Sequence, residues 1–103
     1  MAYELNDTLL LFDEGKAMRH CIAAYASMYK TDRNFMFSLR NMVDGKRRST
    51  LHVQLNEVEL FTICQHRSFA NQEPDQECME AADTLINLLN DLSAPYRKIG
   101  ARE

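Results

Sequence analysis

The stretch that decides the fold is residues 13–29, DEGKAMRHCIAAYASMY, which predicts one amphipathic helix. Its apolar side chains recur at the three- and four-residue spacing that places them on one face of a helix. They are Met18, Cys21, Ile22, Tyr25, Met28 and Tyr29. Asp13 and Glu14 suit the amino end of this helix because the helix dipole is positive there. Residues 8–12 are predicted either as a single helical turn or as a short strand at the sheet edge.

Three segments with alternating apolar residues follow and predict strands at residues 35–40, 50–55 and 60–67. Turn-forming residues at Asp44-Gly45 and Asn56-Glu57 connect these segments. Short connections of this kind join antiparallel neighbours. The sequence therefore predicts a three-stranded antiparallel sheet.

The register of the third strand depends on the turn at Asn56-Glu57, because a slip of one residue exchanges the two faces of the strand. A two-residue turn and a three-residue loop are the alternatives. The longer loop places Phe61 and Ile63 on the core face and is preferred, since it buries more apolar surface. Gln65 and Arg67 would then continue on that same core-facing side.

A second helix is predicted to open at residues 73–75, where a proline and two acids suit the first helical turn, and to end at residues 93–95. Its expected buried stripe consists of Cys78, Ala81, Ala82, Leu85, Ile86, Leu89 and Leu92. The predicted fold class is α+β, in the order helix, three antiparallel strands, helix, with both helices packed on one face of the sheet. Residues 1–95 are expected to form a single domain and residues 96–103 a flexible tail.

The amino-acid composition limits the classes of function that are expected. The 103 residues carry a formal net charge of −3, which disfavours direct nucleic-acid binding because phosphate contacts require a basic surface. Three cysteines without close spacing fit a reducing compartment better than a disulfide framework or a zinc site. With no secretion signal and no long apolar run, we expect a cytoplasmic protein, in a bacterial cell or an infected host cell, with no membrane, metal or cofactor.

His20 and Cys21 are the candidate catalytic residues, since a thiol beside an imidazole can act as a nucleophile. Adjacent residues on a helix do not face each other, however, so His20 is poorly placed to be the base for Cys21. Free cysteine is also among the most commonly buried residues. A packed core thiol is therefore the preferred interpretation of Cys21.

Arg40, Gln65, Arg67 and Asn71 are candidate binding residues near the ends of the first and third strands. An arginine flanked by amides suits a phosphate, a carboxylate or a backbone ligand. The alternative is a structural network that ties the loop after the third strand to the first helix, because buried polar groups need partners. Both interpretations stay open.

Two further surfaces are candidates for binding. Thr50 and His52 are predicted to face the side of the sheet that the helices leave uncovered, where a protein partner or a twofold-related copy could dock. On this view His52→Glu would abolish binding and leave the thermal melt unchanged. Lys46, Arg47 and Arg48 form a basic run that is either a solvated turn or a modest patch for an anionic ligand.

The sequence resembles the PcfJ-like family, which is found in conjugative plasmids, phages and related mobile elements of bacteria. The resemblance covers residues 9 to 90 and rests on four segments, which are Glu14-Gly15-x-x-Met18-x-His20-Cys21-Ile22-x-x-Tyr25, Phe37-Ser38-Leu39-Arg40, Ser49-Thr50-Leu51 and Gln65-x-Arg67-x-x-x-Asn71. The family usually has an acidic residue at the position of His52 and glycine at the positions of Ala23 and Ser68. Losing that carboxylate weakens any acid–base or metal scheme that depends on it.

Two functions are expected from these observations. The preferred one is a small mobile-element protein that binds a protein or nucleoprotein partner and inhibits or assists host or transfer machinery. The alternative is a hydrolase or transferase in which Cys21 or His20 reacts and Arg40, Gln65, Arg67 and Asn71 hold an anionic substrate.

Overall fold

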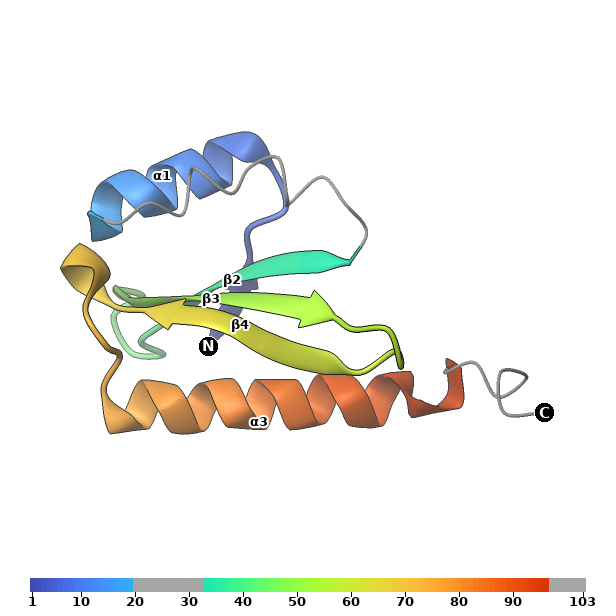
Figure 1. The fold of residues 1–103 in the computed structure, drawn as a ribbon. Helices are drawn as coiled ribbons and strands as arrows, with labels where there is room; N and C mark the ends of the chain where they lie inside the picture. Colours follow the sequence, from blue (N-terminus) through green and yellow to red (C-terminus); the bar gives the residue numbers. More distant parts are fainter. Residues whose placement is uncertain (20–32, 97–103) are drawn as a thin grey trace.

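Four antiparallel strands and two α-helices make up the computed structural model, which describes residues 1–19 and 33–96 (Figure 1). The elements are β1 (Ala2–Glu4), α1 (Thr8–Met18), β2 (Asn34–Arg40), β3 (Arg47–Leu55), β4 (Phe61–Arg67), the short 3-10 helix η2 (Phe69–Asn71), α3 (Gln76–Ser93) and η3 (Ala94–Tyr96). The predicted α+β class and the antiparallel sheet are confirmed, and both helices contact the sheet.

The sheet has the order β1-β2-β3-β4, so it contains one strand more than the sequence predicted. β1 pairs with β2, with Ala2 opposite Leu39 and Glu4 opposite Phe37. Backbone hydrogen bonds between Met1 and Arg40 extend this pairing at one end. A strand of three residues is too short to show the alternation by which strands are recognised in a sequence.

The first helix begins earlier than predicted. Asp7 caps α1, because its side chain accepts a hydrogen bond of 2.8 Å from the backbone N–H of Leu10. The helical alternative for residues 8–12 is therefore correct, and the start near residue 13 is wrong. α1 ends at Met18, where Arg19 adopts a left-handed conformation with φ of 52°. Residues 20–32, which held the rest of the predicted helix, lie outside the described residues.

The two helices lie on opposite faces of the sheet, which corrects the prediction that they share one face (Figure 1). Leu39, Leu51 and Val53 form a core cluster with Ala82 of α3, whereas Thr50 bonds to Glu14 of α1. Neighbouring residues of a strand point to opposite faces, so residues 49–53 of β3 are buried from both sides. The face that carries Thr50 and His52 is therefore covered, and His52 is only 4% exposed.

A β-bulge in β4 changes which face its last residues occupy. Ile63 lies opposite Val53 and Phe61 opposite Leu55, which confirms the predicted orientation of this half of the strand. The register then shifts by one residue at Cys64, so that Gln65 lies opposite His52.

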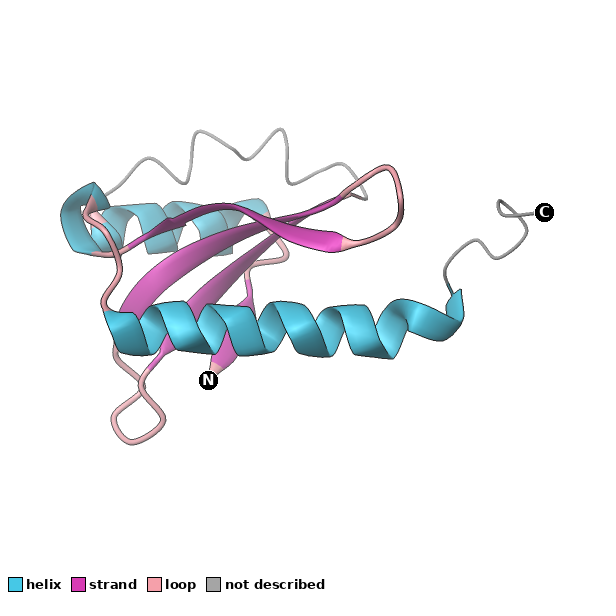
Figure 2. Ribbon diagram, turned by 60° about the horizontal axis from the view of Figure 1, so that its bottom comes forward, coloured by secondary structure: helices cyan, strands magenta, loops and turns pink. Residues whose placement is uncertain are grey.

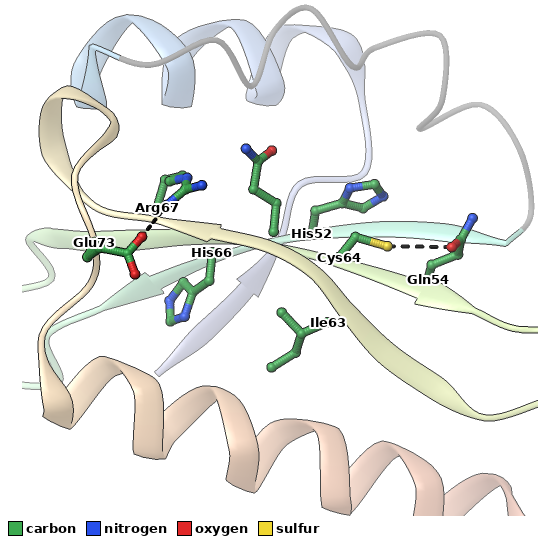
Figure 3. A pocket seen from close by; sticks show the side chains of 8 residues that line it. His52, Gln54, Ile63, Cys64, His66, Arg67 and Glu73 are labelled. Carbon is green, nitrogen blue, oxygen red and sulfur yellow. Dashed lines mark hydrogen bonds and ion pairs between the residues drawn. The ribbon is translucent and has the colours of Figure 1, made fainter.

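The bulge corrects the prediction for the end of β4. Beyond it, Arg67 lies opposite Thr50 on the α1 side of the sheet, and His66 lies opposite Leu51 on the α3 side. Figure 3 shows the two side chains on opposite sides of the strand. Gln65 and Arg67 therefore leave the face of Phe61 and Ile63 instead of continuing on it.

Candidate functional site

Glu14 is the centre of a buried polar cluster between α1 and the sheet. Its side chain is 0% exposed. Arg47 donates from Nε to Glu14 Oε1 at 2.8 Å, and Arg40 Nη2 lies 3.8 Å from the same oxygen. Thr50 donates from Oγ1 to Glu14 Oε2 at 2.5 Å. Arg40 also donates from Nε to Ser38 Oγ at 3.0 Å. We call these five residues the arginine–glutamate cluster.

The basic run at residues 46–48 does not form one patch, which corrects that candidate. Arg47 turns toward Glu14 on the α1 side, while Arg48 turns to the α3 side and bonds to Asp75 at 2.6 Å and Glu77 at 2.9 Å. The backbone N–H of Cys78, together with Arg48, lowers the pKa of Asp75. Adjacent strand residues point to opposite faces, so Arg47 and Arg48 serve two different networks.

A second polar site lies along β4, which is an edge strand of the sheet (Figure 3). It is an open cavity of about 560 Å³. The lining residues are His52, Gln54, Ile63, Cys64, Gln65, His66, Arg67 and Glu73. Arg67 Nη1 donates to the carboxylate of Glu73, whereas Arg67 Nε is buried without a hydrogen-bond partner in the described part of the chain.

The structure brings together only part of the predicted anionic pocket. Gln65 and Arg67 share the β4 cavity. Asn71 is exposed in η2 with φ of 65° and does not line the cavity. Arg40 lies two strands away in the arginine–glutamate cluster. The candidate nucleophile Cys21 and its neighbour His20 lie outside the described residues.

Two side-chain pairs that sequence reasoning missed involve histidines, and the first is buried while the second is part-buried. His52 Nε2 lies 2.8 Å from Asn34 Oδ1, and His66 Nε2 lies 2.8 Å from Ser49 Oγ. The Ser49–His66 pair resembles a nucleophile and a base, but Ser49 is completely buried under α3 and no substrate can reach it. Partial desolvation raises the pKa of both Cys64 and Cys78, which disfavours their thiolate forms. Residues 1–19 and 33–96 contain no cluster suited to a metal ion.

The stability of the protein is expected to fall as the pH drops below 6.5, the ordinary pKa of histidine. Burial lowers the pKa of His52 and His66, and the carboxylates near His66 only partly oppose this effect. The unfolded chain therefore takes up protons that the folded protein does not. The neutral histidine side chains stabilise the folded protein fully at a pH above the histidine pKa of the unfolded chain. This stabilisation is lost as the pH falls from that value toward the lower histidine pKa of the folded protein.

Urea denaturation at about pH 7.5 and about pH 5.5 measures this difference. We expect His66→Gln to reduce this difference, because one of the two imidazoles whose pKa is lowered by burial is then absent. A free energy of unfolding that stays constant or rises toward the lower pH contradicts burial of neutral histidines.

An apolar groove lies beside α3, between the helix, β1 and residues 41–43 of the β2–β3 loop. The ribbon in Figure 2 shows the N-terminus, where β1 begins, next to α3. Its volume is about 550 Å³. The lining residues are Met1, Ala2, Leu39, Arg40, Asn41, Met42, Val43, Arg48, Glu77, Cys78, Ala81, Thr84, Leu85 and Leu88. We call this the α3 groove. The sequence did not single it out, although the predicted apolar stripe of this helix was wider than one sheet contact requires.

Comparison with known proteins identifies a family. No curated protein and no solved structure matches the chain. Neither α1 nor α3, the helices of residues 1–19 and 33–96, is long and apolar enough to span a membrane. Residues 5–82 match the family described as PcfJ-like protein, which is more than half of the 103 residues. The match includes α1, the strands β2, β3 and β4, and the amino-terminal part of α3. The chain therefore belongs to the PcfJ-like protein family.

Proposed function

We propose that this protein binds a protein or nucleoprotein partner in a phage or plasmid context, where it inhibits or assists host or transfer machinery. The α3 groove is the proposed contact surface. The observation that carries the proposal is a row of apolar side chains on α3 that the sheet does not cover. Leu88 is 52% exposed, and Leu92, one helical turn further on, is also exposed.

The β2–β3 loop provides the opposite wall of the groove. Met42 and Val43 are both exposed, and the side chain of Val43 is 96% accessible to solvent. The Asn41 side chain fixes the loop, because its Oδ1 accepts hydrogen bonds from the backbone N–H groups of Val43 and Asp44. Exposed apolar side chains held on a rigid turn beside an apolar groove are typical of a protein-binding surface.

The charge of α3 indicates the chemistry of the partner. Glu80, Asp83 and Asp91 lie on this helix outside the groove, whose own charged lining residues are Glu77, Arg40 and Arg48. The acids outside the groove favour a partner segment in which lysine or arginine flanks the apolar contacts. They also disfavour a nucleic-acid backbone. A nucleoprotein would therefore be bound through its protein component.

We expect Leu88→Glu to abolish capture of the partner from host lysate, because the substitution places a charge in the apolar groove. Asn87→Glu is the matched control, since Asn87 is exposed on the same helix but does not line the groove. Both variants should keep the free energy of unfolding within about 0.5 kcal/mol of the parent value. Quantitative mass spectrometry of the captured proteins compares the two variants.

The same pair of variants separates the other possibilities. Equal capture by Leu88→Glu and by the parent protein contradicts the proposed surface. A parent dimer that becomes a monomer on Leu88→Glu, measured by sedimentation, shows that the occupant is a second copy. The hydrolase or transferase alternative predicts instead that Cys21→Ser or His20→Ala abolishes activity while Leu88→Glu does not.

A further inference from the structure

The arginine–glutamate cluster carries a surplus of positive charge. Arg40 and Arg47 share one carboxylate, that of Glu14. On the opposite face of the same sheet end, the single guanidinium of Arg48 has two carboxylates, Asp75 and Glu77. No second acidic partner of Arg40 or Arg47 occurs in residues 1–19 and 33–96. Arg40 and Arg47 therefore share a single carboxylate, whereas Arg48 alone has two.

The two guanidinium groups of this cluster are also held in place. Arg40 donates to Ser38 and lies over the ring of Tyr3, with 4.8 Å between the guanidinium carbon and the ring centroid. Arg47 is fixed by the hydrogen bond from its Nε to Glu14. Both arginines approach the same oxygen of Glu14, so a single small anion can reach both.

The terminal nitrogen atoms of the Arg40 and Arg47 guanidinium groups are available to bind a ligand. Apart from the approach of Arg40 Nη2 to Glu14, their terminal nitrogens have no partner among the described residues. The side chains are partly open to solvent, at 23% for Arg40 and 34% for Arg47. Planar guanidinium donors match the oxygen atoms of phosphate and carboxylate groups.

We propose that Arg40 and Arg47 bind a small oxyanion of the phosphate type on the solvent side of Glu14. Arg40 also lines the α3 groove, so this site adjoins the groove at that residue, and it extends the proposed function to a second ligand. The ligand is a single phosphate group and not a polyanion, because the chain has a formal net charge of −3 and long nucleic-acid contacts require a broad basic surface. Free phosphate and a phosphate monoester share this chemistry.

The test is a calorimetric titration of the whole protein with inorganic phosphate at low ionic strength, repeated with phosphoserine. The parent protein is expected to bind phosphate saturably. Arg47→Gln should weaken the affinity for phosphate at least about tenfold, because it removes one charge-assisted hydrogen bond. Lys46→Gln is the matched control, because it removes one positive charge from the neighbouring exposed residue and leaves the site intact. Its affinity should stay within about twofold of the parent value, since exposed charges interact weakly.

Glu14→Gln gives a second test that loss of folding cannot imitate. The amide oxygen still accepts from Arg47 Nε, its NH2 group can donate to Thr50 Oγ1, and the competing negative charge is gone, so phosphate should bind several-fold more tightly. Tighter binding of phosphoserine than of phosphate identifies a monoester as the ligand, and the reverse order identifies the free ion. No saturable binding by the parent protein overturns the proposal, as does equal binding by Arg47→Gln or weaker binding by Glu14→Gln. Binding of an oligonucleotide without binding of phosphate overturns it as well.

Discussion

His52→Glu is expected to lower the free energy of unfolding by about 4 kcal/mol, because it places a carboxylate in a buried site. His52 is 4% exposed on the face of the sheet that carries α1, and its ring bonds to Asn34 Oδ1 at 2.8 Å. A glutamate there loses its hydration, because the site is almost closed to solvent. The loss should be smaller at low pH, since protonation removes the buried charge and the folded-state pKa of the new glutamate is raised.

Gln54→Glu is the matched control for this substitution. Gln54 lies two residues further along the same strand and on the same face, but it is exposed. The control should change the free energy of unfolding by no more than about 0.5 kcal/mol. Urea denaturation of the two variants measures the contrast. A melt of His52→Glu equal to that of the parent protein would show that α1 does not cover this face, as the sequence alone had suggested.

Glu14→Leu is expected to cost about 3 kcal/mol of the free energy of unfolding. The substitution leaves Arg40 and Arg47 without their shared counter-charge and removes an acceptor from Thr50. Breaking a buried ion pair from one side typically costs 3 to about 5 kcal/mol. We expect the lower end of this range because the two arginines are partly exposed and can regain water.

Asp13→Leu serves as the control on the same helix, since Asp13 is exposed and directly precedes Glu14. Its effect should lie within about 0.5 kcal/mol of zero. Urea denaturation at neutral pH measures both variants. Equal stability of Glu14→Leu and Asp13→Leu would mean that the arginine–glutamate cluster does not attach α1 to the sheet.

The strands could be predicted from the sequence, whereas their environment could not. The alternation in β2, β3 and β4 gave their positions and the orientation of Phe61 and Ile63 correctly. The polar residues Thr50 and His52 looked like a solvated face, but they are buried because Glu14 and Asn34 supply their partners. Those partners come from distant parts of the chain, and strand periodicity carries no information about them.

Local irregularities account for the remaining differences in the fold. The extra residue at Cys64 moves Arg67 to the α1 side, and a single-residue bulge leaves little trace in a hydrophobic pattern. Arg19 ends α1 in a left-handed conformation that is unusual for a residue other than glycine, so the pattern of residues 13–29 gave no sign of the break. The start of α1 was detectable, since Asp7 is a strong capping residue.

The candidate sites followed from the sequence only in part. Gln65 and Arg67 do share a cavity, but Arg40 belongs to a different cluster, and the residues of the basic run separate between the two faces. The α3 groove was not predicted, because the apolar stripe of the second helix was expected to be buried against the sheet. Ala81 and Leu92, both counted there as buried, are exposed. An apolar stripe wider than the face it covers is a signal for such a groove.

The central claim is that the partner docks in the α3 groove, and hydroxyl-radical footprinting of the protein with and without its captured partner tests it most directly. We predict that the partner protects Met42, Leu88 and Leu92 from oxidation, because these exposed side chains lie in or next to the groove. Ile63 and Cys64 in the β4 cavity should keep their reactivity. Protection of these two residues, with Met42 and Leu88 still reactive, would contradict the account and place the partner on the edge of β4.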